Sequence, residues 1–297
     1  MMKRKKNLLF PFAMTLPALL ILIGLSVFPL LFILYYGLTD YYLLSKSSPQ
    51  FILFENYVKL FNDPYFRQAV VNTLRFSFLA VLTEVLSGLM LACLASSLGK
   101  GTKALRTLLL LPALLPGVTA ALTWQMMLSN HNGIVNKGLA VLGQGPVNWL
   151  MDPKIAFYAI LVIDIWQYAP FVFLLVYAAM QTVPQSQYEA ARIDGAGWLQ
   201  SFYRVTLPNI RGTLALTVML RLIDSFRLFD KVNILTKGGP ANTTATITQY
   251  IYQNGIRSLK VGYGAAASVI MTLIILVPSA FYIAKSLKGS FKKGRHP

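Results

Sequence analysis

A chain of 297 residues has the length of one or two soluble domains, but its composition excludes a soluble surface. Apolar residues make up 56% of it and charged residues only 12%, and several apolar runs reach the length of about 18 residues that can span a membrane. The net charge of +17 would suggest nucleic acid in a soluble protein. Here the basic residues lie mostly beside the apolar runs, so they indicate membrane topology and no nucleic-acid partner is expected.

The apolar runs predict an all-α integral membrane protein with six transmembrane helices, at about 10–38, 70–98, 105–129, 154–182, 209–236 and 262–287. The expected organisation is a basic N-terminus over 1–9, a transmembrane domain over 10–287 with its core at 70–287, and a basic tail over 288–297. The first run follows Lys3 to Lys6, as in a signal peptide. It is too long for one and lacks a small-residue cleavage site, so we expect a retained anchor.

Basic residues are distributed unequally between the two sides of these spans. On the side of both termini, four lie in the N-terminus, three in 99–106, three in the segment that contains Glu189 and five from Lys285 onward, which makes 15. The loops on the opposite side carry eight. Because the more basic side of a membrane protein faces the cytoplasm, both termini and the Glu189 segment are expected there.

The segment 184–208, between the fourth and fifth spans, is polar and charged. Pro184 can occupy the first turn of a helix, the residues after it are good helix formers, and Gly195 suits a helix C-cap. A second short helix is expected over 198–206, with Trp198 on its buried side and Leu207-Pro208 ending it. The segment is therefore predicted as a helix–turn–helix outside the hydrocarbon, placed to contact a cytosolic partner.

Glu189-Ala190-Ala191 is followed after three residues by Gly195, and after nine more by Val205 and then Leu207-Pro208. With this spacing the segment resembles the EAA loop of permease subunits in binding-protein-dependent ABC importers. The resemblance implies that a short coupling helix inserts into a cleft on an ATPase subunit. The residues expected to carry this coupling are Glu189, Ala190, Ala191, Asp194, Gly195, Leu207 and Pro208. The alternative is an ordinary amphipathic cytosolic loop.

Two other spans contain residues that are unusual in a membrane helix: prolines in the third and a lone carboxylate in the second. Pro112, Pro116 and Gly117 are expected to kink the third span, because they free backbone carbonyls in a helix that can line a cavity. Glu84 lies deep in the second span, where a carboxylate is costly and usually faces the bundle interior. It is either a buried, hydrogen-bonded structural residue or a proton-coupling site.

The fourth span carries a polar stripe. Asp164, Gln167 and Tyr168 have i, i+3, i+4 spacing and therefore share one face of a helix. A polar stripe on a spanning helix should point into the bundle or toward a wet cavity. These residues either line a solute path or form hydrogen bonds between helices.

The fifth span is the most polar. Its charged residues follow one another at intervals of three, which permits ion pairs along one helix: Arg221, Asp224, Arg227 and Asp230. Four residues are expected on one face: Phe226, Phe229, Asp230 and Asn233. Aromatic rings can stack on sugar faces while a carboxylate and an amide bind hydroxyls, so these four together with Asp164 and Tyr168 are the predicted substrate path. Mutual neutralisation against neighbouring helices is the alternative.

Further positions extend the resemblance over nearly the whole chain. The outer loop over 39–69 is expected to hold a short amphipathic helix, which either packs at the interface or docks a soluble partner. Its residues 54–57 and the later sequence Thr236-Lys237-Gly238-Gly239-Pro240 are similar to those of carbohydrate-type permeases, of the maltose and glycerol-phosphate kind. Gly238, Gly239 and Pro240 are the expected contact with an external binding protein.

The family implies a type I importer in the bacterial cytoplasmic (inner) membrane. Its other parts would be a second, homologous permease subunit, two ATP-binding cassette subunits and an extracytoplasmic solute-binding protein. The chain has no Gly-x-x-x-x-Gly-Lys-Ser/Thr loop, so ATP and Mg²⁺ are expected on the ATPase subunits, with no cofactor on this chain. We expect it to transport by alternating access and not to be an enzyme.

An ion-coupled secondary transporter that uses Glu84, Asp164 or Asp224 is the rival interpretation. It leaves the Glu189 segment unexplained, and no inverted repeat is evident. An integral-membrane enzyme has no recognisable catalytic arrangement to support it. The two histidines lack the spacing of a metal site.

Overall fold

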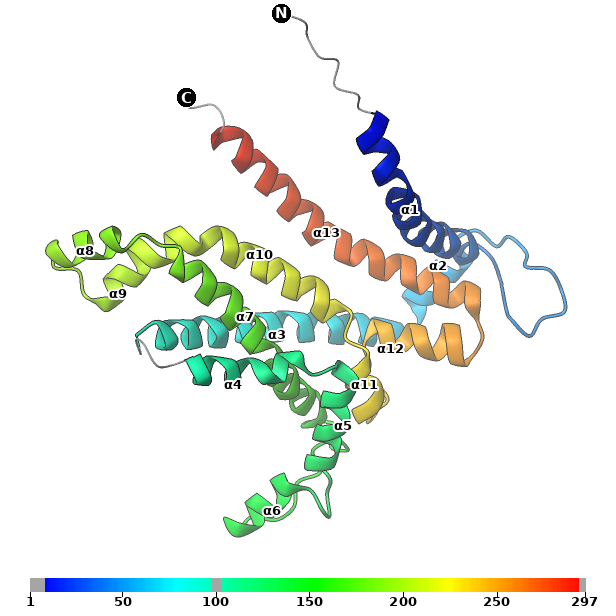
Figure 1. Ribbon diagram of the computed structural model, residues 1–297. Helices are drawn as coiled ribbons and strands as arrows, with labels where there is room; N and C mark the ends of the chain where they lie inside the picture. The colour runs from blue at the N-terminus through cyan, green and yellow to red at the C-terminus, as the bar shows by residue number, and fades with distance from the viewer. Residues whose placement is uncertain (1–8, 98–102, 294–297) are drawn as a thin grey trace, which may run out of the picture. The chain divides into compact units, whose positions relative to one another are not determined.

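The computed structural model describes residues 9–97 and 103–293, which form helices joined by turns and loops, with an isolated β-bridge between Thr39 and Phe51 (Figure 1). The predicted N-terminus over 1–9 lies outside these residues except for Leu9, and so do 294–297 of the predicted tail. The chain divides into two compact units. The first consists of Met1–Asp63 and Ile251–Leu273, and the second of Pro64–Tyr250 and Ile274–Pro297.

Four helices in the described part of the chain are long and apolar enough to cross a membrane. They are α1 (Leu9–Gly37), α3 (Pro64–Ser97), α7 (Ala156–Gln181) and α13 (Val261–Lys293). A fifth span can be formed by α4 (Lys103–Leu114) and α5 (Gly117–Met127), which meet at a bend of 98°. The predicted interruption at Pro112, Pro116 and Gly117 is thus confirmed, and it is a break in the helix.

The prediction of one continuous helix over 209–236 is wrong. The structure has α10 (Leu207–Phe226), a short break, and then α11 (Asp230–Leu235). The carbonyl of Leu228, freed by the break, accepts hydrogen bonds from the hydroxyls of Thr246 (2.9 Å) and Thr248 (2.5 Å). Side chains thus take the role of the helical donor that the break removes, so this carbonyl remains hydrogen-bonded.

The first unit is built around the end of α1. The predicted amphipathic helix of the outer loop is α2 (Glu55–Asn62), and its buried Asn56 donates hydrogen bonds to the carbonyls of Gly37 (3.1 Å) and Thr39 (2.8 Å). The π-helix η2 (Tyr252–Arg257) precedes the start of α13. There a Cβ on Gly262 would lie 2.2 Å from the carbonyl oxygen of Thr39, so only glycine allows this approach.

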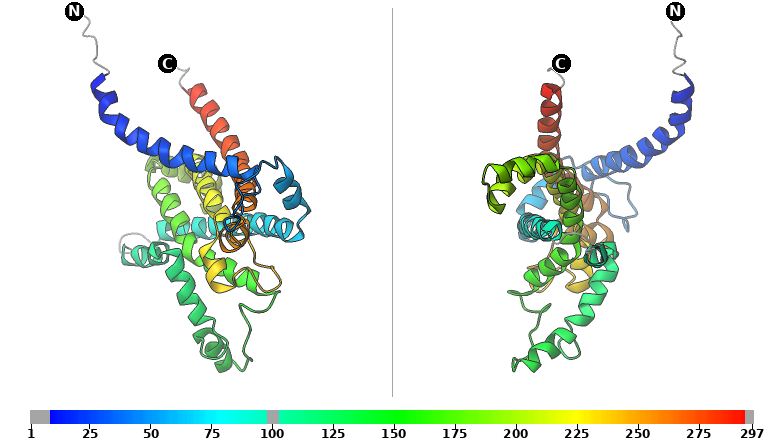
Figure 2. Two further views of the ribbon diagram at one scale, coloured as in Figure 1. Left: turned by 90° about the vertical axis from the view of Figure 1, so that its right-hand side faces the viewer. Right: turned by 60° about the vertical axis from the view of Figure 1, so that its left-hand side comes forward.

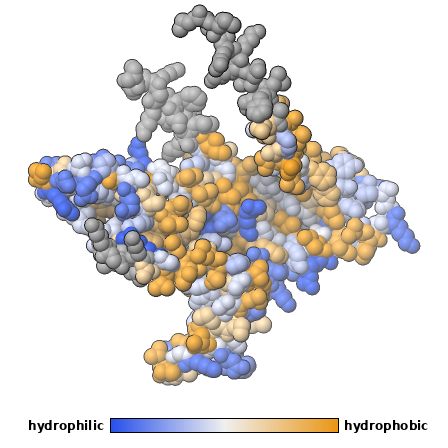
Figure 3. All heavy atoms as spheres, viewed as in Figure 1, coloured by the Kyte–Doolittle hydropathy of each residue, from blue (hydrophilic) through white to orange (hydrophobic). Residues whose placement is uncertain are grey.

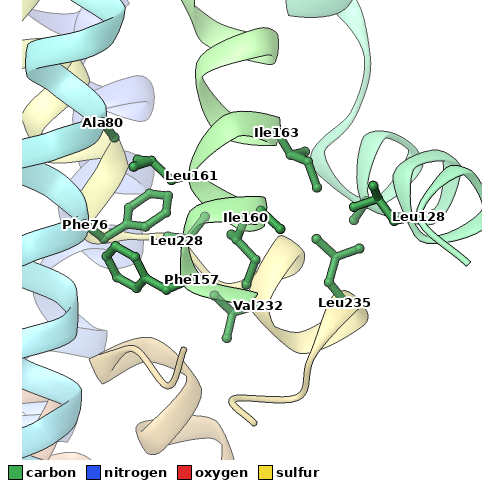
Figure 4. Packing of buried hydrophobic residues seen from close by; sticks show 12 residues of the cluster. Phe76, Ala80, Leu128, Phe157, Ile160, Leu161, Ile163, Leu228, Val232 and Leu235 are labelled. Atoms are coloured by element: carbon green, nitrogen blue, oxygen red, sulfur yellow. The ribbon is translucent and has the colours of Figure 1, made fainter. Parts of the chain in front are cut away.

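The second unit has α3 and α7 at its centre, which pack together along much of their length. A Cβ added to Gly88 of α3 would lie 2.6 Å from a methyl group of Val172, so the two backbones come close through a glycine. Near the N-terminal end of α7, side chains from α3, α5, α7 and α11 interdigitate (Figure 4). They include Phe76, Leu128, Phe157, Ile160, Val232 and Leu235.

The two ends of α7 lead to different structures. Its N-terminal end follows the loop that contains α6 (Ile134–Val141), while its C-terminal end leads into α8 (Gln185–Ile193) and α9 (Trp198–Ser201), which are separated from α6 in both further views (Figure 2). Apolar side chains cover much of the visible face of α4, α7 and α10, with a polar patch beside the C-terminal half of α10 (Figure 3). An apolar outer face is what contact with lipid requires.

Candidate functional site

The predicted helix–turn of the Glu189 segment is confirmed. Pro184 is the N-cap of α8, with φ −59° and ψ 131°. Gly195 follows the helix with φ +76°, and the N–H groups of Gly195 and Ala196 donate to the carbonyls of Arg192 (3.0 Å) and Ala191 (2.8 Å). This is the left-handed ending that glycine favours, because an L side chain is strained at positive φ.

The second half of the segment differs from its prediction in two ways. α9 runs directly into the π-helix η1 (Phe202–Thr206), which continues into α10, so Leu207-Pro208 begins a helix and does not end one. Proline is accepted in a first helical turn, where its missing N–H breaks no intrahelical bond. Trp198, expected on a buried side, is 66% exposed, whereas Phe202 and Val205 are partly buried.

Several apolar side chains of this segment, which we call the coupling loop (residues 184–208), are left exposed by the described part of the chain. No residue of α8 is buried, and Ile193 is 87% exposed. Leu199 and Tyr203 are also exposed. Among the predicted coupling residues, Glu189, Ala190, Asp194, Gly195 and Pro208 are exposed, and Ala191 and Leu207 are partly buried. Exposed apolar groups in a polar segment indicate a surface for a protein partner.

The coupling loop is nevertheless held in a fixed position. The hydroxyls of Tyr188 and Thr206 are hydrogen-bonded at 3.0 Å, and Asn209 donates to the Gln187 amide oxygen at 2.8 Å. Behind the loop is a cavity of about 640 Å³, lined by the ends of α3 and α7 and by Arg192 and Trp198 of the loop. The two hydrogen bonds join α8 to the junction with α10, so the loop moves together with that helix.

A group of charged residues lies inside the second unit. Glu84 of α3 and Arg221 of α10 are 0% and 2% exposed. Arg221 donates from Nε to one oxygen of Glu84 (2.8 Å) and from Nη2 to the other (3.1 Å). Such a two-bond arginine–carboxylate pair is strong and directional. Glu84 is therefore a paired, structural carboxylate, one of the two roles open for it in the sequence.

Two more carboxylates and a lysine complete this ion cluster, which we define as the buried Glu84, Asp164, Arg221 and Lys231 together with the exposed Asp224. Arg221 Nη1 donates to Asp224 at 2.7 Å, which confirms the first of the ion pairs expected along the fifth span. Lys231 of α11 forms a buried ion pair with Asp164 of α7. Both cations also lie over the ring of Tyr168, at 3.8 Å for the Arg221 guanidinium carbon and 4.4 Å for Lys231 Nζ.

The ion cluster borders a cavity of about 280 Å³. It is lined by Gly117, Asp164, Tyr168, Arg221, Asp224, Ser225, Arg227, Leu228, Phe229, Asp230 and Lys231. Four of the six predicted path residues are thus brought together: Asp164, Tyr168, Phe229 and Asp230. Cations close to an aromatic ring, with carboxylates beside it, form a polar cavity suited to groups that donate hydrogen bonds.

The other two predicted path residues lie elsewhere. Phe226 ends α10 and is 5% exposed, and Asn233 accepts a hydrogen bond from Gln249 at 3.3 Å. The prediction that Phe226 shares a face with Phe229 and Asp230 is wrong, because the break after Phe226 changes the direction of the chain. Asn233 lies in α11 with Asp230, three positions later, but is not among the residues that line the cavity.

The Gly-Gly-Pro loop after α11 is tied down by polar side chains. Asn72 of α3 donates to the carbonyls of Asn242 and Ala245, both at 3.0 Å, and Thr244 donates to the Gly239 carbonyl at 2.6 Å. Gly238 has φ +89° and is buried, while Gly239 and Pro240 remain partly exposed. A fixed, partly exposed loop is suited to present a defined surface.

Sequence reasoning missed Lys231 and the partner of Glu84. Lys231 directly follows Asp230 within an expected span, and a charged side chain in a membrane is normally paired. That rule could have identified Lys231 as a buried residue. It could not have identified its partner, which is 67 positions away, nor the Glu84–Arg221 pair, which is 137 positions apart.

Residues 84–284, which contain the coupling loop and the ion cluster, match the model of the family described as "binding-protein-dependent transport system inner membrane component". The chain belongs to this family. It is 33% identical over 282 residues to the trehalose/maltose transport system permease protein MalF of Thermococcus litoralis, covering 95% of this chain and 94% of that one. It is 34% identical over 267 residues to the sulfoquinovosyl glycerol transport system permease protein SmoG of Agrobacterium fabrum, covering 90% and 87%.

Solved structures of this permease family agree with the fold. A bacterial alginate ABC transporter in complex with an alginate pentasaccharide-bound periplasmic protein contains a chain that superimposes with a TM-score of 0.82, at 26% identity over 92% of each chain. The permease described here is thus a helical, multi-pass membrane transport protein with the fold of ABC importer permeases, and its family is not one of enzymes.

Proposed function

We propose that this permease is one of two pore-forming subunits of an ATP-driven importer for a sugar, an oligosaccharide or a related polyol, in the bacterial cytoplasmic membrane. The observation that carries the proposal is the coupling loop, a rigid segment with exposed Ile193 and Trp198. Its partners would be a second, homologous permease subunit, two ATP-binding cassette subunits that hold ATP and Mg²⁺, and an extracytoplasmic solute-binding protein. The saccharide names of the relatives support the solute class.

The coupling loop can act on the cavity because the same two helices reach both. Asp164 and Tyr168 lie on α7, about 26 Å and about 20 Å along the helix from the end that leads to the loop, and Arg221 lies on α10 about 21 Å from the loop. When the ATPase subunits close, a displacement of the loop moves both helices. The cavity then opens to the outside, where the Gly238–Pro240 loop would meet the loaded binding protein.

The ion-coupled alternative draws no support from Glu84. Both of its oxygens accept hydrogen bonds from Arg221, an arrangement that pairs the carboxylate within the chain. A carboxylate held this way is suited to fixing α3 against α10.

The test is capture of the complex from membranes of the native organism, with Gly195→Asp compared with Gly143→Asp. Both glycines have positive φ, +76° and +75°, and a Cβ at either position meets nothing within 4 Å. The two substitutions therefore impose similar backbone strain and no internal clash. Only Gly195 lies in the coupling loop.

We expect the parent chain and Gly143→Asp to be recovered with a second permease and an ATPase, and Gly195→Asp without the ATPase. Recovery of the parent chain alone, or as a homo-oligomer, would overturn the importer proposal and favour ion-coupled transport. Equal ATPase recovery with both variants, together with normal transport, would show that the coupling loop is not the contact.

A further inference from the structure

We infer that the cavity beside the ion cluster selects solutes by charge: it accepts neutral or amino-bearing sugars and polyols and excludes solutes that carry carboxylate, phosphate or sulfonate groups. This inference rests on the proposed function, since it assigns a solute class to the proposed path. The observations are the balance of the buried charges, a buried oxygen without a donor, and the carboxylates at the rim.

The buried cations are already neutralised. Arg221 and Lys231, each 2% exposed, face Glu84 and Asp164, which are 0% and 1% exposed. Three N–H groups of Arg221 donate to Glu84 and Asp224, and Lys231 is paired with Asp164. An anionic solute could reach these cations only by displacing a carboxylate that cannot leave the protein. Removing one partner from a buried ion pair is strongly unfavourable.

One oxygen of the ion cluster still needs a donor. Asp164 Oδ2 is buried, accepts no hydrogen bond from any residue in the described part of the chain, and lies 3.6 Å from Arg221 Nη2. Asp164 lines the cavity. This oxygen is shielded from solvent, so a solute reaches it only when the cavity widens. A hydroxyl or an ammonium group can then donate to it, whereas a carboxylate, phosphate or sulfonate presents only acceptors when ionised. The unmet hydrogen bond therefore favours a donor group on the solute.

The exposed charges of the cavity lining also disfavour anionic solutes. Asp224, whose side chain is 54% exposed, and Asp230 face solvent together with one cation, Arg227. Neither Arg227 nor Asp230 has an ion-pair partner among the described residues. The accessible lining thus carries two carboxylates against one guanidinium. Since a cavity with low-dielectric walls concentrates the field of its charges, anions are repelled at its entrance.

Charged thiol reagents can measure this preference without knowledge of the natural solute. Phe229 lines the cavity, so Phe229→Cys places a thiol there, in a Cys93→Ser background that removes the native cysteine. In the complete importer, the reaction rate with a trimethylammonium methanethiosulfonate is compared with that of the sulfonate reagent of similar size. The ratio of the cationic to the anionic reaction rate is divided by the same ratio for a small free thiol. Both are measured at low ionic strength, where screening is weakest.

We expect the cationic reagent to be favoured about tenfold. Asp230→Asn should lower this ratio and Arg227→Gln should raise it, each about tenfold, because one unit charge several ångströms away changes the two rates by about threefold in opposite directions. A ratio of one or below, or shifts of the opposite sign, would overturn the charge preference while leaving the importer proposal intact. A thiol that reacts with neither reagent would instead contradict the placement of the solute path.

The natural solute provides the second measurement. Once the importer's binding protein has been captured with the complex, the solute released from it can be identified by mass, and its net charge follows. A neutral or positively charged sugar agrees with the inference. An acidic glycan that is transported with ATP would overturn it and would still support the importer proposal.

Discussion

The coupling loop and the ion cluster are connected by the same two helices, α7 and α10, and have opposite environments. α8 has no buried residue, and apolar side chains such as Ile193 and Trp198 are exposed. In the ion cluster, Glu84, Asp164, Arg221 and Lys231 are all at most 2% exposed, and the charges are paired within the chain. The loop requires a partner to cover it, whereas the cluster is nearly complete by itself.

This contrast predicts that substitutions in the two regions affect different properties of the permease. Changes in the ion cluster should alter the stability of the permease, because the groups that lose a partner remain buried. Changes in the coupling loop should alter assembly, because the surface they modify is exposed in the isolated chain. Three substitutions test the contrast, from the largest expected effect to the smallest.

Arg221→Met should have the largest effect. It leaves Glu84 buried without a counter-charge, which destabilises a protein by about 3–5 kcal/mol. Thermal unfolding of the detergent-solubilised permease measures the loss. The double variant Glu84→Leu, Arg221→Met should recover most of the stability, because a buried pair can be replaced by apolar side chains at little cost. Equal instability of the single and double variants would show that Glu84 is not the group left unpaired.

Ile193→Ser should act on assembly alone. Ile193 is 87% exposed, so the unfolding temperature of the isolated permease should hardly change. Loss of an apolar side chain from a covered interface costs about 1–2 kcal/mol, which is about a tenfold weaker association with the ATPase. Titration of labelled ATPase against the reconstituted permease measures it. Val141→Ser, a change at an equally exposed position (87%) in α6, is the control and should leave the association intact.

Tyr188→Phe should have the smallest effect. It removes the hydroxyl that is bonded to Thr206 at 3.0 Å and keeps the ring, so about 1 kcal/mol is lost from the attachment of α8 to the start of α10. ATP hydrolysis should become partly uncoupled from transport, with more ATP consumed per solute imported. An unchanged ratio would mean that the hydrogen bond does not transmit the movement of the loop.

The coupling loop could be predicted from sequence because local signals determine it. Pro184 marks the start of α8 and Gly195 adopts the positive φ that ends it. The bend between α4 and α5 follows from Pro112 and Pro116 in the same way. Each of these features depends on residues a few positions apart, which is the range over which backbone preferences act.

The ion cluster and the break after Phe226 could not be predicted, because distant residues produce them. The stretch from Leu222 to Val232 contains no proline or glycine, so nothing local indicates a break. The break is stabilised by Thr246 and Thr248, which bind the Leu228 carbonyl, and by the pairing of Lys231 with Asp164. Both interactions exist only after the helices have packed, so tertiary structure overrides the helical preference of the sequence.

The π-helix η1 determines the direction in which the coupling loop faces around the axis of α10. A π-turn holds one residue more than an α-turn, and η1 comprises the five residues Phe202–Thr206 at the start of α10. Deleting one of these residues would return the segment to α-helical winding. The preceding helices of the coupling loop, α8 and α9, would then be rotated by about 100° around the axis of α10. Ile193 would then face a different direction although every exposed residue of the loop was retained. The number of residues in this segment, more than their identity, sets the angle at which the permease presents its coupling surface.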